Sequence, residues 1–415
     1  MKHPIRNFAG ALSGNFLEYY DVTLYGVLAS FLAPVFFPTQ SEFVSTLLTL
    51  GAFSITYLAR PFGGMVFGFL GDRFGRKMAL TLAVLLVTVP TFAIGLMPSY
   101  AQIGVLAPIL VLTCRFLQGL CTGGEYPGVA VFISEHSAPS KRGFLCALVP
   151  ASSLLGGFTG ALVGAYFMQE GMPGRGWRVP FIVGGVLGLV AFTLRQQLSE
   201  TKDFEELQAT QSLYKYPLLE TLKTQKRVIL GSALIAAGAV AHYCMIIVWM
   251  VNFMPHPHIT LTISEKLLLS SSLMAAIFMS MPLAGLLTDH FGPRRLMVWS
   301  AIALALISYP FFILASTAES ILTLFFALAT LAAISAGFAA PTVSFLTAQF
   351  PPRNRYSAMG FSVPLGEALG GATPPIASLI FQFSGSPLSP ALYLCLISLI
   401  AILGIPLMKQ DKVPT

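Results

Sequence analysis

The sequence predicts an all-α membrane protein of twelve transmembrane helices in two pseudo-symmetric six-helix bundles. Three observations support this fold class. Of the 415 residues, 55% are hydrophobic and only 10% are charged, against about 25% charged in soluble domains. Twelve apolar segments each have about the 17–25 residues needed to cross a bilayer. A short charged loop occurs once in each half of the chain, which is typical of an internally duplicated membrane protein.

The apolar segments define the order of the predicted helices. They divide the chain into an N-terminal six-helix bundle (1–194), a cytoplasmic central loop (195–227) and a C-terminal six-helix bundle (228–415). The longer segments include interfacial turns. The segments are 8–37, 43–71, 78–97, 103–133, 144–168, 178–194, 228–255, 265–288, 296–315, 321–345, 357–382 and 387–408.

The basic residues predict the orientation in the membrane. If the N-terminus is cytoplasmic, 19 of the 24 Lys and Arg residues fall in cytoplasmic loops and tails. Only Arg175, Arg178 and Lys266 fall outside. Because cytoplasmic loops carry the excess of bases, we expect a multi-pass protein of the cell (inner) membrane with both termini in the cytoplasm. The first apolar segment is too long and too acidic for a cleaved signal peptide.

Composition and motifs also exclude several classes of function. All five cysteines lie in predicted helices, so no disulfide framework is expected. The absence of a G-x-x-x-x-G-K-[ST] motif argues against an ATP-driven pump. We therefore expect no enzyme activity, no cofactor, no metal site and no nucleic-acid partner. The expected partners are a small-molecule substrate, protons and the lipid bilayer. We expect the protein to be a monomer.

The repeated loop joins the second and third segments, and again the eighth and ninth. Its first copy is Gly68-Phe-Leu-Gly-Asp-Arg-Phe-Gly-Arg-Lys77, and its second is Gly285-Leu-Leu-Thr-Asp-His-Phe-Gly-Pro-Arg-Arg295. Each copy carries an acid, a turn glycine and a basic pair. The loop resembles that between helices 2 and 3 of the major facilitator superfamily, with the pattern G-x-L-[GA]-D-[KR]-x-G-R-[KR]. The first copy matches every defined position, and the second departs at Thr288, His290 and Pro293.

This resemblance implies two six-helix bundles around a central cavity and a gate at the cytoplasmic ends of the helices. The gate would be closed by an acid that pairs with a base or a helix N-terminus of the opposite bundle. The expected gating residues are Asp72, Arg73, Arg76, Asp289 and Arg295.

The first helix carries polar residues on one side, since Asn15, Glu18, Asp21 and Tyr25 fall together at 100° per residue. Two acids near mid-membrane are costly unless they are paired or functional. They predict a substrate or proton site, with a structural ion pair to a neighbouring Arg as the alternative. The string at residues 14–21 also resembles the first helix of the metabolite:proton symporters, the branch with proline/betaine, citrate, 2-oxoglutarate and shikimate transporters.

The second helix carries Arg60 within an R-P-x-G-G string that again resembles the symporter branch. Arg60 lies 12 residues before Asp72, which is about 18 Å along a helix. That is too deep for its guanidinium to reach the cytoplasm easily. We expect it to pair with Glu18, with Asp21 or with an anionic ligand.

The fourth helix brings Arg115, Gln118 and Glu125 onto one face. Resemblance associates the R-x-x-Q-G string at residues 115–119 with proton coupling, and the G-G-E-Y string ending at Tyr126 with the metabolite symporters. With Arg115 as its only nearby base, Glu125 suits reversible protonation, although a structural role remains the alternative. We expect the transported proton to bind Glu125 or Asp21.

Three further stretches complete the expectations. Glu367 lies among glycines just before Pro374-Pro375, which predicts a kinked helix lining the cavity, with Glu367 and Gln118 as secondary members of the site. In the central loop, residues 200–204 resemble the E-T-x-x-F string that follows helix 6 in the symporter branch, and we expect an amphipathic connector with no chemistry of its own. Glu135 is expected to be a solvated charge at the gate.

The predicted function is proton-coupled uptake of a small polar metabolite by alternating access. Arg60 and Arg115 suit a carboxylate, so an organic acid such as citrate or 2-oxoglutarate is favoured. The alternatives are a proton-coupled zwitterion (proline/betaine) symporter, a citrate-type siderophore importer and a drug/proton antiporter. Gly156, Gly160 and Gly164 predict close helix packing, and their helix lacks the glycine-proline motif typical of drug antiporters.

Overall fold

The computed structural model describes residues 4–40, 42–167, 176–252, 254 and 258–408. The bases Lys2, Arg175, Lys409 and Lys412 lie outside these residues. The N-terminal helices are α1 (Pro4–Val27), α2 (Ala29–Phe36), α3 (Glu42–Phe74), α4 (Arg76–Leu96), α5 (Tyr100–Ile103), α6 (Leu106–His136), α7 (Arg142–Phe167) and α8 (Arg178–Gln196). They are followed by α9 (Lys202–Ala209) and α10 (Pro217–Thr224). The C-terminal helices are α11 (Lys226–Tyr243), the π-helical turn η2 (Cys244–Trp249), α12 (Met250–Asn252), α13 (Ile263–Phe291), α14 (Pro293–Ser316), α15 (Ile321–Gln349), α16 (Arg355–Gly371), α17 (Thr373–Ser384) and α18 (Ser389–Gly404).

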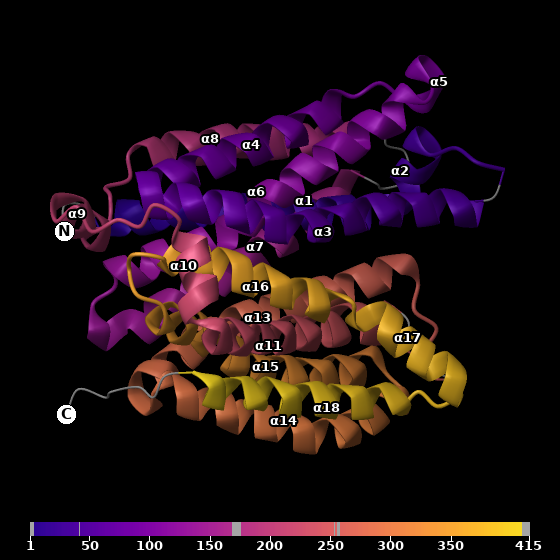
Figure 1. The fold of residues 1–415 in the computed structure, drawn as a ribbon. Coiled ribbons are helices and arrows are strands. Elements are labelled where there is room, and N and C mark those ends of the chain that lie inside the picture. Colours follow the sequence, from indigo (N-terminus) through magenta and orange to yellow (C-terminus); the bar gives the residue numbers. More distant parts are fainter. Residues whose placement is uncertain (1–3, 41, 168–175, 253, 255–257, 409–415) are drawn as a thin grey trace.

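The helices form two bundles that lie side by side with their axes roughly aligned (Figure 1). One bundle contains α1, α3, α4, α6, α7 and α8, and the other contains α11 and α13–α18. Between the bundles, α3 packs against α16 and α7 packs against α13. The start of α1 and the end of α18 lie at the same end of the molecule (Figure 1). The predicted fold class is confirmed.

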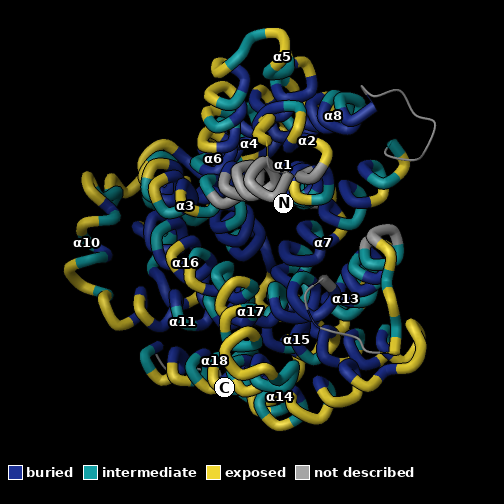
Figure 2. Tube along the Cα trace, turned by 90° about the vertical axis from the view of Figure 1, so that its right-hand side faces the viewer, coloured by how far each residue is buried: buried dark blue, intermediate teal, exposed yellow. Residues whose placement is uncertain are grey.

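The exterior of the bundles suits a bilayer. Nine helices of the described residues are long and apolar enough to cross a membrane. Large apolar side chains such as Leu306 and Met279 are exposed on the outside, and seen from the end, buried residues concentrate where the helices face one another (Figure 2). The predicted segments that do not meet this criterion correspond to α1, α3 and the broken pair α16–α17. These helices carry the buried charges Glu18, Arg60 and Glu367, which lie close together.

Glycines set the distances between several helices. A Cβ added at Gly156 or Gly160 on α7 would lie 2.1 or 2.5 Å from the carbonyl oxygen of Phe16 or Tyr20 on α1. This confirms the close packing predicted from the four-residue spacing of glycines. Gly63 meets the Leu120 backbone within its own bundle, whereas Gly64 meets the Gly360 backbone of the other bundle. The two glycines of the R-P-x-G-G string therefore serve two different interfaces.

Turns and breaks also follow the sequence. Gly75 and Gly292, the turn glycines of the repeated loop, have φ angles of 112° and 86°, which other residues rarely adopt. The expected kink in the eleventh segment is confirmed, because α16 ends at Gly371 and α17 begins at Thr373. Proline lacks the amide hydrogen that a continuous helix needs, so Pro374 and Pro375 favour a new helix start there.

Candidate functional site: buried charges between the bundles and at their ends

Asp21 and Arg115 form a closed polar ring within the N-terminal bundle. Arg115 Nη1 donates to Asp21 Oδ2 at 2.7 Å and to Gln118 Oε1 at 2.9 Å. Gln118 donates to the Thr91 hydroxyl, which donates to Asp21 Oδ1, both at 2.9 Å. The Tyr25 ring lies 4.2 Å from the Arg115 guanidinium carbon. The structure therefore brings three of the predicted site residues together, and Asp21 accepts a hydrogen bond at each oxygen.

Glu125 has a different partner from the one expected. It pairs with Arg195, which donates to both oxygens of the carboxylate. Arg195 also donates to the carbonyl oxygens of Gly10 and Ala11. The assignment of Arg195 to the central loop is wrong: it lies in the last turn of α8 and is fully buried. The interpretation of Arg115 as the only base near Glu125 is wrong for the same reason.

Arg60 bridges the two bundles. Its Nη1 donates to Glu367 Oε2 at 2.8 Å, from α3 to α16. Its Nη2 lies 3.7 Å from Glu18 Oε1 on α1, beyond hydrogen-bond distance. The Tyr57 ring lies 4.3 Å from the guanidinium carbon. Glu18 is thus near Arg60 as predicted, but the closer partner is Glu367, which the sequence treated as a secondary member of the site.

The interior of the described bundles holds four acids and three arginines from these contacts, so acids outnumber bases. All seven residues are buried, with 6% exposure or less. Each arginine has a carboxylate within 2.8 Å or in direct contact, and one acid remains in excess. The acids are Glu18, Asp21, Glu125 and Glu367, and the bases are Arg60, Arg115 and Arg195.

Asp72 joins the two bundles at the end of the molecule that also holds Asp289, here called the gate end. Asp72 is 1% exposed. Its oxygens accept from the amides of Tyr356 at 3.2 Å and Ser357 at 2.8 Å. These amides belong to the first turn of α16, where unpaired N–H groups and the helix dipole favour a negative charge. The sequence anticipated this type of contact for a closed gate.

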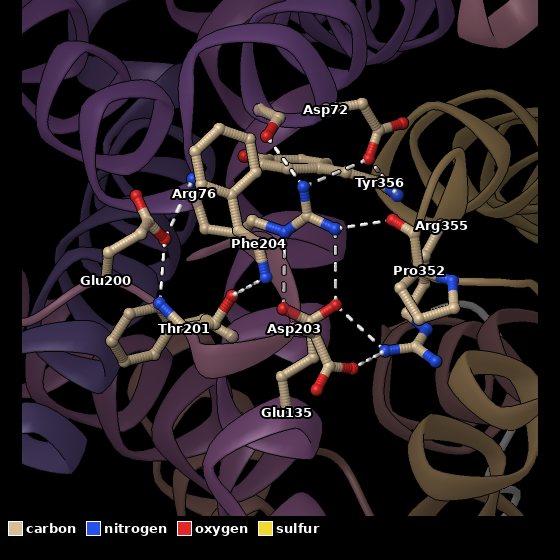
Figure 3. A network of polar contacts seen from close by, with 12 residues as sticks. Asp72, Arg76, Glu135, Glu200, Thr201, Asp203, Phe204, Pro352, Arg355 and Tyr356 are labelled. Carbon is tan, nitrogen blue, oxygen red and sulfur yellow. Dashed lines mark hydrogen bonds and ion pairs between the residues drawn. The ribbon is translucent and has the colours of Figure 1, made fainter. Parts of the chain in front are cut away.

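Arg76 extends the contact into a buried network (Figure 3). Its guanidinium lies 3.4 Å from Asp72 and 3.2 Å from Glu135, and it donates to the Pro352 carbonyl at 2.7 Å. Glu135 also pairs with Arg355 at 2.8 Å. One acid of the N-terminal bundle is therefore shared between bases of both bundles.

The central segment contributes to this network. Asp203 on α9 pairs with Arg355 at 3.0 Å, and Glu200 accepts from the amides of Arg76 and Lys77, each at 3.1 Å. Burial raises the pKa of Glu200, opposed by these amides and by the Arg76 charge. The connector thus contacts both bundles, and the expectation that it has no chemistry of its own stays a prediction. The expectation that Glu135 is solvated is wrong, because its side chain is fully buried.

Asp289 makes the related contact at the second copy of the loop. It accepts from the amides of Gly143 at 2.6 Å and Phe144 at 2.9 Å, in the first turn of α7. Asp289 is exposed, as are Arg73 and Arg295. Neither of these arginines forms an ion pair among the described contacts. Their gating role stays a prediction.

A buried ion pair joins the two bundles across the middle, and loop acids cap helices of the opposite bundle at one end. This is the arrangement that the family resemblance implied for a transporter with a gate. A model of the family "Sugar (and other) transporter" matches residues 7–230, and a model of the "Major Facilitator Superfamily" matches residues 245–415. The chain belongs to the major facilitator superfamily, in its branch of metabolite:proton symporters.

Named relatives cover nearly the whole chain. The proline/betaine transporter of Salmonella typhimurium is 33% identical over 96% of this chain and 82% of its own length. The glycine betaine/proline/ectoine/pipecolic acid transporter of Dickeya dadantii is also 33% identical, over 96% of this chain and 82% of its own. The citrate-proton symporter of Klebsiella pneumoniae is 29% identical over 94% of this chain and 89% of its own.

Solved structures show the same fold. The proton:xylose symporter XylE bound to 6-bromo-6-deoxy-D-glucose superposes with a TM-score of 0.79 at 16% identity, covering 96% of this chain and 94% of that one. The fucose:proton symporter of E. coli reaches 0.72 at 15% identity, covering 97% and 98%. At these identities the likeness supports the fold alone.

Proposed function

We propose that this protein takes up a small zwitterionic solute of the proline or betaine kind together with a proton. Several relatives that match nearly the whole chain are named as transporters of such solutes. The observation that carries the proposal is the interior charge balance, in which Arg60, Arg115 and Arg195 each already face a carboxylate of the protein.

The charge balance disfavours a multiply charged anion. A citrate would add up to three negative charges to a buried set in which each arginine already faces a carboxylate of the protein. Unpaired buried charges are costly, and leaving one uncompensated costs about 3–5 kcal/mol. A zwitterion adds one charge of each sign, so its carboxylate can pair with an arginine while its ammonium group pairs with the carboxylate that this arginine releases. The organic acid favoured by the sequence therefore becomes the second candidate.

Aromatic side chains beside the charges suit an ammonium or quaternary ammonium group. Tyr19 and Tyr126 interact electrostatically with Glu18 and Glu367, and Tyr57 lies against Arg60. All three tyrosines are partly exposed although they adjoin buried charges. The faces of aromatic rings attract such cations by about 0.5–2 kcal/mol each.

Transport would occur by rocking of the two bundles around this cluster. We propose that residues 1–195 and 228–415 move as two bodies, so that the connecting segment begins after Arg195. The gate end, with Asp72 and Asp289, would face the cytoplasm together with both termini, because most Lys and Arg residues lie there.

A competition assay tests the substrate class. Inside-out and right-side-out vesicles containing the protein are given radiolabelled L-proline with an excess of glycine betaine, citrate or 2-oxoglutarate. We expect uptake of L-proline that glycine betaine inhibits and the two organic acids do not. Uptake of labelled citrate, unaffected by glycine betaine, would overturn the proposal in favour of the second candidate, for which the Klebsiella citrate-proton symporter gives a specific precedent.

A further inference from the structure

Glu18, Arg60 and Glu367 form a cluster of two acids around one base, contributed by three helices. Arg60 donates to Glu367 at 2.8 Å and lies 3.7 Å from Glu18. Glu18 and Arg60 belong to the N-terminal bundle, whereas Glu367 belongs to the C-terminal bundle. The base is therefore shared between an acid of its own bundle and an acid of the other.

Glu18 is the member of this cluster without a hydrogen bond. It is 1% exposed, and neither of its oxygens has a hydrogen-bond partner in the described part of the chain. A buried ionised carboxylate is tolerated only when it is paired and hydrogen-bonded. A protonated carboxyl carries no such charge, so the neutral form of Glu18 suits this environment.

The other predicted proton carriers are in the opposite situation. Asp21 accepts hydrogen bonds from Arg115 and Thr91, and Glu125 accepts two from Arg195. Hydrogen bonds to an ionised carboxylate favour the charged form. In this conformation both acids therefore have an arginine and hydrogen-bond donors of their own, which Glu18 lacks among the described residues.

The charged and titratable groups around Glu18 come from every packed helix that carries one. Arg60 is the nearest base, and the two other acids in range add negative charge. The groups that interact with Glu18 are Tyr19 on α1, Tyr57 and Arg60 on α3, Cys121, Glu125 and Tyr126 on α6, Arg195 on α8 and Glu367 on α16.

We propose that Glu18 binds the transported proton and that Arg60 controls its release by exchanging Glu367 for Glu18. In the conformation seen here Arg60 is paired with Glu367, so Glu18 holds a proton on its carboxyl group. When the bundles separate at the gate end, α3 moves away from α16 and Arg60 loses Glu367. Arg60 then pairs with Glu18, the O–H bond of the carboxyl breaks, and the proton leaves toward the open side.

The exchange links the proton to the conformational change through a contact that crosses the interface. The proton-binding part rests on the geometry of the cluster, whereas its use in symport rests on the function proposed above. Two measurements keep these parts apart, since the first needs no substrate.

Infrared spectroscopy of the purified full-length protein in lipid measures the protonated carboxyl directly. At neutral pH we expect a carboxylic-acid carbonyl band in the wild-type protein that Glu18→Gln removes. Glu206→Gln, which changes an exposed carboxylate of α9, is the matched control and should leave the band unchanged. A band that survives Glu18→Gln, or one that disappears in Asp21→Asn or Glu125→Gln instead, would overturn the assignment.

Transport in proteoliposomes tests the coupling. With L-proline as substrate, Glu18→Gln should lose accumulation driven by a pH difference while retaining proline–proline exchange, which also shows that the variant folds. Glu18→Gln protein that still accumulates proline under the pH difference would overturn the coupling role. Wild-type accumulation that follows a sodium difference instead of a pH difference would overturn the proton-coupling role of Glu18. If the wild type exchanges no proline, the proposed function fails, and the infrared result alone decides the proton site.

Discussion

The two interfaces between the bundles are built from the same parts but in very different surroundings. At α3–α16, Gly68 lies against the Ser357 backbone, and Asp72 caps α16. At α7–α13, Gly285 lies against the Phe144 backbone, and Asp289 caps α7. Each loop acid is thus four residues after a glycine that admits the opposite helix. The internal repeat in the sequence reappears as a repeated contact in space.

The surroundings of the two contacts differ in burial and in charge. Asp72 is buried and connected through Arg76 and Glu135 to Arg355 of the other bundle. Asp289 is exposed, and its hydrogen bonds within the described part of the chain are the two to the α7 amides. Only the first interface adds the Gly64–Gly360 approach and the Arg60–Glu367 pair.

The repeated loop therefore determines the geometry with which Asp72 and Asp289 cap a helix of the opposite bundle, while burial determines how much each contact stabilises the closed gate. Charges near solvent are screened, whereas the same contact in a buried setting is worth several times more. The α3–α16 interface should therefore control closure of the gate end, and the α7–α13 interface should adjust it.

The largest effect is expected for Gly64→Ala. A Cβ there would lie 1.6 Å from the Gly360 carbonyl oxygen, and backbone cannot yield as a flexible side chain can. The gate end should stay open and uptake should be lost. Spin labels are placed at Ser140 and Arg353, exposed residues of different bundles. Double electron–electron resonance should give a longer distance between the labels in Gly64→Ala than in the wild-type protein. Gly371→Ala is the control, because its Cβ would meet the Tyr57 ring at an ordinary 3.7 Å. An unchanged distance between the labels in Gly64→Ala would show that the α3–α16 interface does not control closure of the gate end.

The next effect is expected for Asp72→Asn, which removes the charge from a buried helix cap. Loss of a charge-assisted contact of this kind costs about 1.5–3 kcal/mol, which shifts the ratio of closed to open gate roughly 10- to 150-fold. The same spin-label pair should show this shift, and transport should slow. Wild-type populations in Asp72→Asn would contradict the importance given to the α3–α16 interface.

A smaller effect is expected for Asp289→Asn. An acid at an exposed helix N-terminus contributes about 0.3–1 kcal/mol, so the ratio should shift only about two- to fivefold. Raising the salt concentration should weaken the Asp289 contact more than the Asp72 contact. If Asp289→Asn shifted the populations as far as Asp72→Asn, burial would not be what distinguishes the two interfaces.

The sequence predicts how deep a charged residue lies in the membrane and on which face of its helix, but not which other helix packs against that face. Hydropathy and base placement were sufficient for the helices and for the burial of Glu18, Asp21, Arg60 and Arg115. The Arg115–Gln118 contact followed from helical spacing. In contrast, Arg60 and Glu367 are 307 residues apart, and a helical pattern does not indicate which helix packs against its polar face.

Residues near helix ends were the hardest to place. Arg195 at the end of a predicted span resembles a solvated cytoplasmic base, yet α8 continues through it and buries it against Glu125. Glu135 precedes Lys141 and Arg142 in the chain and suggested a solvated cluster, but its partners are Arg76 and Arg355. In both cases the missing information was a contact with another helix.

The central claim is that a zwitterion and a proton cross together, and the driving force for uptake tests it most directly. A zwitterion with one proton carries one net positive charge, so both a pH difference and an inside-negative potential should drive its accumulation. Proteoliposomes are prepared with either a pH difference or an inside-negative potential across the membrane, each without the other. The accumulated L-proline or glycine betaine is then measured. We expect accumulation above equilibrium under each force alone. Equilibration without accumulation under both forces would contradict it.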